Sequence, residues 1–351
     1  MRLTLLVPEL IWPEPTDQNT LGKLSRPGFE WLAARAAYRR QPAAAFEIAL
    51  ARQFGLATPS LGALRLLGED VSAGAVEGHW LCADPVHLRF HHERIVLADA
   101  GAFDLAEDEA REIAAALNAE FADIGQLHVA TARRWYLRLN PAGSAFAGAS
   151  GHVAPPLSAV AGRRVDSEIS EHDATLTRWL NEVQMFLHGH PLNTRREQAG
   201  QPVLNSLWLW GGGHLTRPSP GQFSAVWSNH PLATGLARAA GTPAHPLPAG
   251  LAGLLQLASS GSAPLVVLDT LLPPVLYEDS DGWRQAWQQL ETSWFAPLRR
   301  SLGRPVRELN IVAPTIYGEL HWSLRGIDRW KFWRRSRPLA ALAGEIAEGK
   351  P

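Results

Sequence analysis

The chain lacks most features of secreted and membrane-spanning proteins. Its one cysteine, Cys82, cannot form a disulfide within the chain, as expected in a reducing compartment. The apolar run Leu3–Val7 ends at Pro8 without a small-residue cleavage site, so no signal peptide is predicted. No apolar stretch approaches the roughly 18 residues of a membrane span. We therefore expect a cytoplasmic protein without a transmembrane segment.

The chain also lacks an excess of charge of either sign. Lysine and arginine total 33 against 34 aspartate and glutamate residues, a net charge of −1. Without a strong positive field, nucleic acid is not an expected partner, and binding to a polyanion requires a local basic patch. Tryptophan is plentiful at 14 residues, which suits either a bulky core or a surface that contacts a partner.

The order of predicted elements indicates the fold class. The run Leu3–Val7 predicts a buried strand, and alanine-rich helices are predicted over 29–36 and 43–54. Further buried strands are predicted at 206–210, 265–268 and, as the last strand, 308–312. Helices are predicted over 173–187 and along the stripe Trp283, Trp287, Leu290 and Trp294. This alternation favours an α/β fold with a mostly parallel central sheet flanked by helices.

The middle of the chain predicts a small α+β insertion domain. Strands at 86–90 and 94–97 form a hairpin pattern, and Asp104 with Glu107 resembles a capping box that opens a helix over 105–121. A strand at 135–139 closes the segment. Because one core seldom serves more than roughly 250–300 residues, we divide the chain. Residues 1–75 and 159–351 form the main domain, 76–141 the insertion and 142–158 a linker rich in small residues.

Several stretches together resemble archaeal-type cofactor-independent phosphoglycerate mutases. The first runs from His190-Pro191-Leu192-Asn193 through Arg195-Arg196, Gly200 and Asn205 to the glycine-rich Trp208–Gly213. The insertion resembles that family's substrate domain in its hairpin, in Leu97–Gly101 and in Trp135–Arg138. The resemblance spans most of the chain and implies an alkaline-phosphatase-like fold. Within it, Cys82–Arg89 and Asn205–Gly213 are similar to the bacterial RpfE-type regulatory proteins.

The resemblance also implies what this chain is missing. Phosphomutases of the alkaline phosphatase superfamily hold two metal ions with Asp and His side chains, and the ions activate a Ser or Thr nucleophile. Proline-containing replacements stand at three ligand positions, namely Pro8-Glu9, Pro273 with Tyr277, and Ala313-Pro314. The nucleophile region falls at Thr58 and Ser60. We therefore predict no metal, no cofactor and no catalytic residue, with this region vestigial.

The glycine-rich exit of the strand at 206–210 is the candidate ligand site. Its backbone N–H groups could cradle an anion beside a basic pair. The favoured alternative is that the glycines only allow a buried strand a tight exit, because no P-loop Lys-Ser/Thr follows. Asp84 is expected in the turn before Pro85. The candidate ligand-binding set is His190, Asn193, Arg195, Arg196, Asn205, Gly211, Gly212, Gly213, His214, Asp84 and His87.

The stretch from Arg325 to Arg337 is basic, and it interleaves Trp330, Phe332 and Trp333 with its charges. Such a mixture could bind the phosphates of a nucleic acid while its rings stack on the bases, or it could lie at a membrane surface. The expected arrangement is the commoner one, with the rings packed on the core and the charges in water.

Three functional hypotheses remain. The leading one is a non-catalytic regulatory or ligand-binding protein, whose partner is a small anionic or phosphorylated ligand or another protein. The second is an active phosphomutase or phosphatase, which requires Glu9, Ser60, Asp269 and Asp281 to converge. The third is an interaction scaffold, which requires exposed rings among Trp283, Trp322, Trp330 and Trp333.

Overall fold

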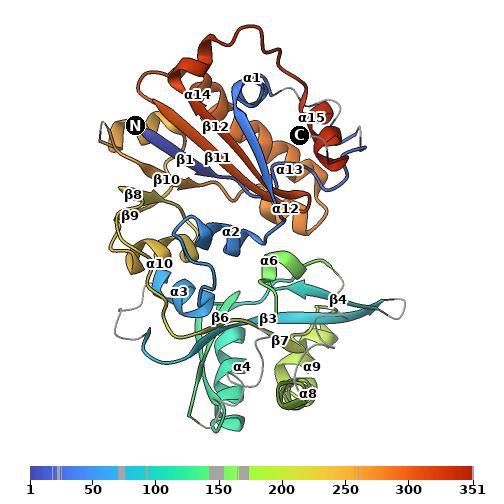
Figure 1. Cartoon of the computed structure of the whole chain (residues 1–351). Helices are drawn as coiled ribbons and strands as arrows, with labels where there is room; N and C mark the ends of the chain where they lie inside the picture. Colours follow the sequence, from blue (N-terminus) through green and yellow to red (C-terminus); the bar gives the residue numbers. More distant parts are fainter. Residues whose placement is uncertain are drawn as a thin grey trace. The chain divides into compact units, whose positions relative to one another are not determined.

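The computed structural model describes residues 1–17, 19–21, 24, 26–69, 76–91, 94–141, 154–163, 165, 174–259 and 261–349. These residues form two compact units (Figure 1). The first unit comprises Met1–Gly55 with Ser219–Pro351, and the second comprises Leu56–Pro218. Each unit has its own sheet and its own core.

The first unit contains a sheet of seven strands in the order β2-β12-β11-β1-β10-β8-β9. The four pairs among β11, β1, β10, β8 and β9 are parallel, and β12 pairs antiparallel with β11 and β2. Leu3 and Leu5 on one face and Leu6 on the other are all buried, so both faces of the central β1 are covered. The strands are β1 (Arg2–Leu6), β2 (Ala37–Gln41), β8 (Ala225–Trp227), β9 (Ala244–His245), β10 (Pro264–Val267), β11 (Glu308–Thr315) and β12 (Gly318–Arg325).

Helices flank this sheet, and one of them contains a π-helical turn. α13 (Ser280–Leu290) continues through η3 (Glu291–Phe295), the π-helical turn, into α14 (Ala296–Ser301). Trp283 and Trp287 of α13 are fully buried. The other helices are α1 (Pro27–Arg35), α2 (Phe46–Arg52), α10 (Pro231–Ala239), α11 (Leu251–Leu257), α12 (Leu272–Leu276), the 3-10 helix η4 (Gly326–Trp330) and α15 (Leu339–Ala347).

The second unit is built on an antiparallel sheet in which β4, β3, β6 and β5 follow one another and β7 also pairs with β3. Its strands are β3 (Trp80–His91), β4 (Arg94–Asp99), β5 (Gly125–Thr131), β6 (Arg134–Leu139) and β7 (Ser206–Gly213). Its helices are α3 (Leu61–Gly68), α4 (Glu107–Glu120), α6 (Leu157–Val160), α8 (Ala174–His188) and α9 (Pro191–Gln198).

The predicted α/β class, with a mostly parallel central sheet flanked by helices, is confirmed. Three details of the elements were wrong. β11 is not the last strand, because β12 follows it as an antiparallel neighbour. The N-cap of α4 is Ala106 rather than Asp104, since the Glu109 carboxylate accepts from the N–H of Ala106. Asp84 lies within β3 rather than in a turn.

The compact units differ in extent from the predicted domains. α3 lies before residue 76, and α8, α9 and β7 lie after residue 158, yet all belong to the second unit. The reason is that β7 pairs along β3 and α3 packs on both strands. Of the predicted linker, residues 142–153 fall outside the described residues, while Leu157–Val160 form α6.

Candidate functional site

The glycine-rich end of β7 runs close to the start of α3. Gly211 and Gly213 have φ angles of +66° and +147°. A Cβ atom at Gly211 would lie 2.7 Å from the Leu61 Cβ, and one at Gly213 would lie 2.9 Å from the Ser60 Cβ. The glycines are therefore required for a close approach of strand and helix, which supports the tight-exit interpretation.

Hydroxyl and imidazole groups gather at this end of β7. The buried Ser60 Oγ lies 2.9 Å from the Thr216 Oγ1 and also accepts a 2.9 Å hydrogen bond from the Thr216 N–H. The rings of His79 and His214 meet edge to face, with centroids 5.3 Å apart. Burial and the adjacent His214 lower the pKa of His79 below its ordinary value. Sequence reasoning missed His79 and Thr216, which have no motif of their own.

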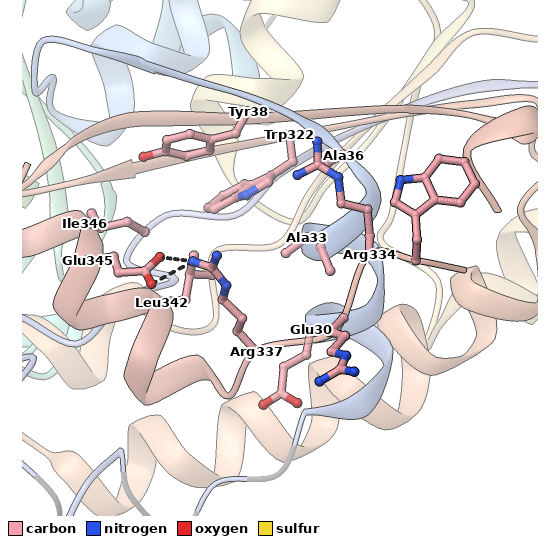
Figure 2. A pocket seen from close by; sticks show the side chains of 13 residues that line it. Glu30, Ala33, Ala36, Tyr38, Trp322, Arg334, Arg337, Leu342, Glu345 and Ile346 are labelled. Carbon is pink, nitrogen blue, oxygen red and sulfur yellow. Dashed lines mark hydrogen bonds and ion pairs between the residues drawn. The ribbon is translucent and has the colours of Figure 1, made fainter. Parts of the chain in front are cut away.

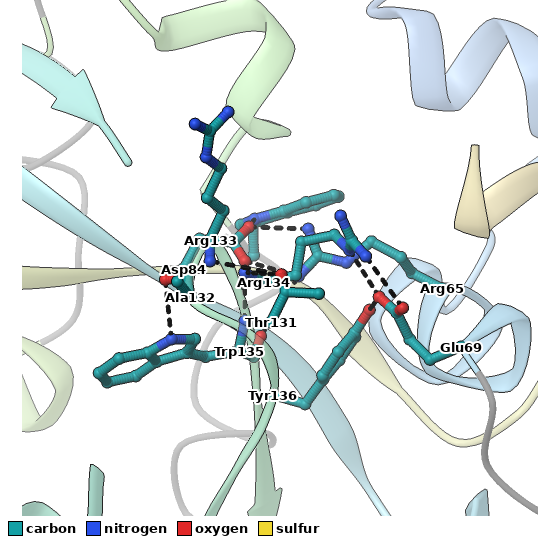
Figure 3. A network of polar contacts seen from close by, with 10 residues as sticks. Arg65, Glu69, Asp84, Thr131, Ala132, Arg133, Arg134, Trp135 and Tyr136 are labelled. Carbon is teal, nitrogen blue, oxygen red and sulfur yellow. Dashed lines mark hydrogen bonds and ion pairs between the residues drawn. The ribbon is translucent and has the colours of Figure 1, made fainter. Parts of the chain in front are cut away.

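Asp84 was expected in a turn with a ligand role, but it is the buried centre of a polar network (Figure 3). Its carboxylate accepts from the Arg65 guanidinium at 2.8 and 2.6 Å, from the Trp210 indole at 2.8 Å and from the Trp135 N–H at 3.2 Å. The Arg65 guanidinium also lies over the rings of Tyr136 and Trp210. These four hydrogen bonds use the accepting capacity of the Asp84 carboxylate within the second unit.

Glu69 continues this network. Its carboxylate accepts from the Arg134 guanidinium at 2.7 and 3.1 Å and from the Tyr136 hydroxyl at 2.7 Å. Burial opposes ionisation of Glu69, but the hydrogen bonds from Arg134 and Tyr136 outweigh it and lower the pKa of Glu69. Burial raises the pKa of the Tyr136 phenol. The network therefore holds a charged carboxylate against a neutral phenol.

The histidine and asparagine of the His-Pro-x-Asn stretch stabilise the chain locally. The His190 Nδ1 accepts from the Leu192 N–H at 3.2 Å and so caps α9. The buried Asn193 amide donates to the carbonyls of Leu187 and Leu204 at 2.7 Å each and accepts from the Leu204 N–H. These contacts use the hydrogen-bonding capacity of the Asn193 side chain within the fold.

Arg195 and Arg196 form ion pairs with two different glutamates. Arg195 is exposed and contacts the Glu112 carboxylate at 3.0 Å. Arg196 is buried, contacts the Glu109 carboxylate at 2.6 Å, and donates to the carbonyls of Asp104 and Pro202. Both guanidinium groups are thus engaged within the second unit.

Asn205 and His87 hold the edge of the second sheet. The Asn205 side chain accepts from the Leu88 N–H at 2.7 Å and donates to the Leu88 carbonyl at 2.9 Å. The His87 Nδ1 lies 2.8 Å from the Val203 carbonyl oxygen.

Of the predicted site, only Ser60, Gly211–Gly213 and His214 gather in one place, and Thr58 is exposed before α3.

The positions where the resemblance implies metal ligands lie in the first unit. Glu9 follows β1 with a φ of 54°, and its N–H donates to the Pro314 carbonyl at 2.9 Å. The Glu9 carbonyl accepts from the Trp283 indole. Asp269 is partly exposed and Asp281 is exposed. Within the described ranges, no three His, Cys, Asp or Glu residues gather in a way that could hold a metal ion.

The basic and aromatic C-terminal stretch does not adopt the expected arrangement. Trp322 is buried, but Trp330, Phe332 and Trp333 are 62%, 82% and 66% exposed. The difference follows from position, since Trp322 faces the core from β12 whereas the other rings lie on η4 and in the exposed turn after it. Next to this turn is a pocket of about 390 Å³ (Figure 2). Sequence reasoning missed it because its walls come from both ends of the chain.

Comparison with known proteins gives a likeness of fold. No family model and no curated protein matches the chain. The chain is similar to the PH0037 protein from Pyrococcus horikoshii, with a TM-score of 0.59 and 14% identity over 97% of this chain and 91% of that one. It also aligns with the cofactor-independent phosphoglycerate mutase from Thermoplasma acidophilum DSM 1728, with a TM-score of 0.43 and 16% identity over 100% and 99%. At 14% identity, the likeness to the PH0037 protein concerns the fold alone. Within the described residues no helix is both long and apolar enough to span a membrane.

Proposed function

We propose that the chain is a non-catalytic regulatory or ligand-binding protein, an RpfE-type relative with a phosphoglycerate-mutase-like, alkaline-phosphatase-like fold. One observation carries the proposal. At the carboxyl edge of the central sheet, the backbone of Glu9 is paired with that of Pro314, and the Glu9 carbonyl is bonded to Trp283. Two-metal phosphoryl transfer needs carboxylate and imidazole ligands converging there, and a proline carbonyl supplies none of them.

The ligand region that we assign is the end of β7 with the start of α3. Ser60, Thr216, His79 and His214 offer hydroxyl and imidazole groups, and α3 adds the partial positive charge of a helix N-terminus. This set of donors suits a small anionic or phosphorylated ligand. The location that we propose is the cytoplasm, which the single cysteine supports.

The rival proposal of an active phosphomutase requires activation of Ser60. The observed partner of its Oγ is the Thr216 hydroxyl, which is neutral and a poor base. Metal analysis of the purified protein, combined with a phosphoglycerate mutase assay in manganese, separates the two proposals. We expect no bound metal pair and no turnover. A bound metal pair with rapid conversion would overturn the proposal.

Ligand binding is tested separately by thermal-shift measurements with phosphorylated metabolites. A compound at 100 times its Kd stabilises the native state by about 2.7 kcal/mol. We expect at least one compound to raise the melting temperature of the wild type, and to lose that effect in Ser60→Ala/Thr216→Val. The control is Ser323→Ala, at an exposed position on β12 of the first unit.

A further inference from the structure

Large apolar side chains are exposed together in one short segment. We call residues 327–337, from Ile327 to Arg337, the basic-aromatic segment. Among the described residues, eight large hydrophobic side chains are exposed, and four of them lie in this segment. They are Ile327 at 73%, Trp330 at 62%, Phe332 at 82% and Trp333 at 66%. Such a concentration of exposed apolar surface marks an interaction site.

The same segment carries an excess of positive charge. Lys331 is paired with Asp328 at 2.8 Å, and Arg337 is paired with Glu345 at 2.5 Å. Arg334 and Arg335, in contrast, are exposed and contribute charge beside the rings of Phe332 and Trp333. The Arg329 guanidinium lies over the Trp330 ring at 4.6 Å. The surface therefore combines apolar rings with cations, and it is complementary to a partner that combines apolar chains with anions.

The segment also lines the pocket beside it. The pocket walls include Arg334, Arg335 and Trp333 from the segment, with Trp322 and Tyr38 from the sheet. The wall also contains Glu30 and Glu345, and Glu345 is paired with Arg337 (Figure 2). The cations that this face presents to an anion are therefore Arg334 and Arg335.

We propose that the basic-aromatic segment docks the protein on the surface of a membrane that contains anionic phospholipids. The rings of Trp330, Phe332 and Trp333 enter the interface between headgroups and acyl chains. Arg334 and Arg335 contact lipid phosphates. This inference does not depend on whether the protein is catalytic.

The geometry favours a membrane over single-stranded nucleic acid. The rings of Phe332 and Trp333 meet at 82°, so they do not form a series of parallel faces for stacked bases. Ile327 has no π-face at all, yet it is the second most exposed apolar side chain of the segment. An aliphatic side chain gains free energy in a lipid interface and gains little from stacking.

Sedimentation with vesicles tests the proposal on the full chain. We expect binding to vesicles of phosphatidylcholine mixed with phosphatidylglycerol, weaker binding to pure phosphatidylcholine, and loss of binding as salt is raised. Each basic residue beside an anionic surface strengthens binding about fivefold, so Arg334→Glu/Arg335→Glu should weaken it at least about 25-fold. Phe332→Ser/Trp333→Ser should also weaken it, at least about tenfold.

Two control variants make the same chemical changes outside the segment. Arg133→Glu/Arg300→Glu reverses two exposed arginines, and Met185→Ser/Leu257→Ser removes two exposed apolar side chains. Both should bind like the wild type, and circular dichroism of every variant checks that it is folded. Absence of binding to anionic vesicles, or equal losses in the segment and control variants, would overturn the proposal. So would retention of single-stranded DNA through Arg334 and Arg335 by a protein that ignores vesicles.

Discussion

Arg65 and Asp84 form a two-pronged ion pair, with nitrogen to oxygen distances of 2.8 and 2.6 Å, whose side chains are only 6% and 1% exposed. The pair joins α3 to β3, and through Trp210 and Trp135 it reaches β7 and β6 (Figure 3). One carboxylate thus ties three strands and a helix of the second unit together.

Removing that carboxylate should be strongly destabilising. Asp84→Ala leaves the Arg65 charge buried without its partner, and such losses cost about 3–5 kcal/mol. Urea unfolding measures the change in the free energy of unfolding. Asp84→Ala/Arg65→Met, which removes both charges, should recover part of it. A loss below about 1 kcal/mol in the single variant would show that the pair does not stabilise the unit.

The start of α1 is held by a residue distant in sequence. The Glu291 carboxylate of η3 accepts from the N–H groups of Gly28 and Phe29 at 2.6 and 3.2 Å. Glu291→Ala should lower the free energy of unfolding by about 2–4 kcal/mol, because two hydrogen bonds to a charged group are lost. Thermal unfolding measures this. Gln289→Ala, at an exposed position of α13, is the control and should change it by less than about 0.5 kcal/mol.

Close packing at the end of β7 is tested by a pair of glycines with nearly equal φ angles. Gly211 and Gly241 have φ angles of +66° and +65°. A Cβ atom would meet Leu61 at 2.7 Å at the first and nothing within 4 Å at the second. Gly241→Ala should cost only the backbone strain of about 1–2 kcal/mol. Gly211→Ala should cost this plus an overpacking term of about 1–3 kcal/mol. Equal costs in denaturant unfolding would refute the close approach.

Acid should destabilise the protein through His79. Its pKa is lowered from 6.5 by burial and by His214, so its imidazole stays neutral in the folded state after the unfolded chain has taken up a proton. The free energy of unfolding should therefore fall as the pH drops below about 6.5, until the lowered pKa is passed. Urea unfolding across this range should show a shallower decline in His79→Gln. His128→Gln, at an exposed position on β5, should keep the wild-type slope.

The sequence predicts the helices and strands that have a local apolar pattern, and it predicts few of the contacts between residues far apart in the chain. β1 and α4 were predictable because their apolar residues follow the period of a strand and a helix. β2 was not, since its residues Ala-Tyr-Arg-Arg-Gln are largely exposed at a sheet edge and show no apolar alternation.

The same limit applies to the candidate site. Asn193 and Asn205 were assigned to a ligand because polar residues in a motif suggest binding. Their actual partners are backbone groups of Leu204 and Leu88, which no spacing rule predicts. The pocket beside the basic-aromatic segment joins Tyr38 to residues roughly three hundred positions later, and no local pattern connects them.

The π-helical turn Glu291–Phe295 holds one residue more than an α-helical turn would. It lies within a continuous helical stretch, with the buried Trp287 and Leu290 before it and the buried Leu298 after it. A single π-helical turn inside an α-helix accommodates an extra residue while the residues on either side keep their faces. Deleting the exposed Thr292 would therefore convert this turn into an α-helical one and leave Leu298 buried. Elsewhere in the helix, where each residue turns the chain by about 100°, the same deletion would rotate every later residue away from its face.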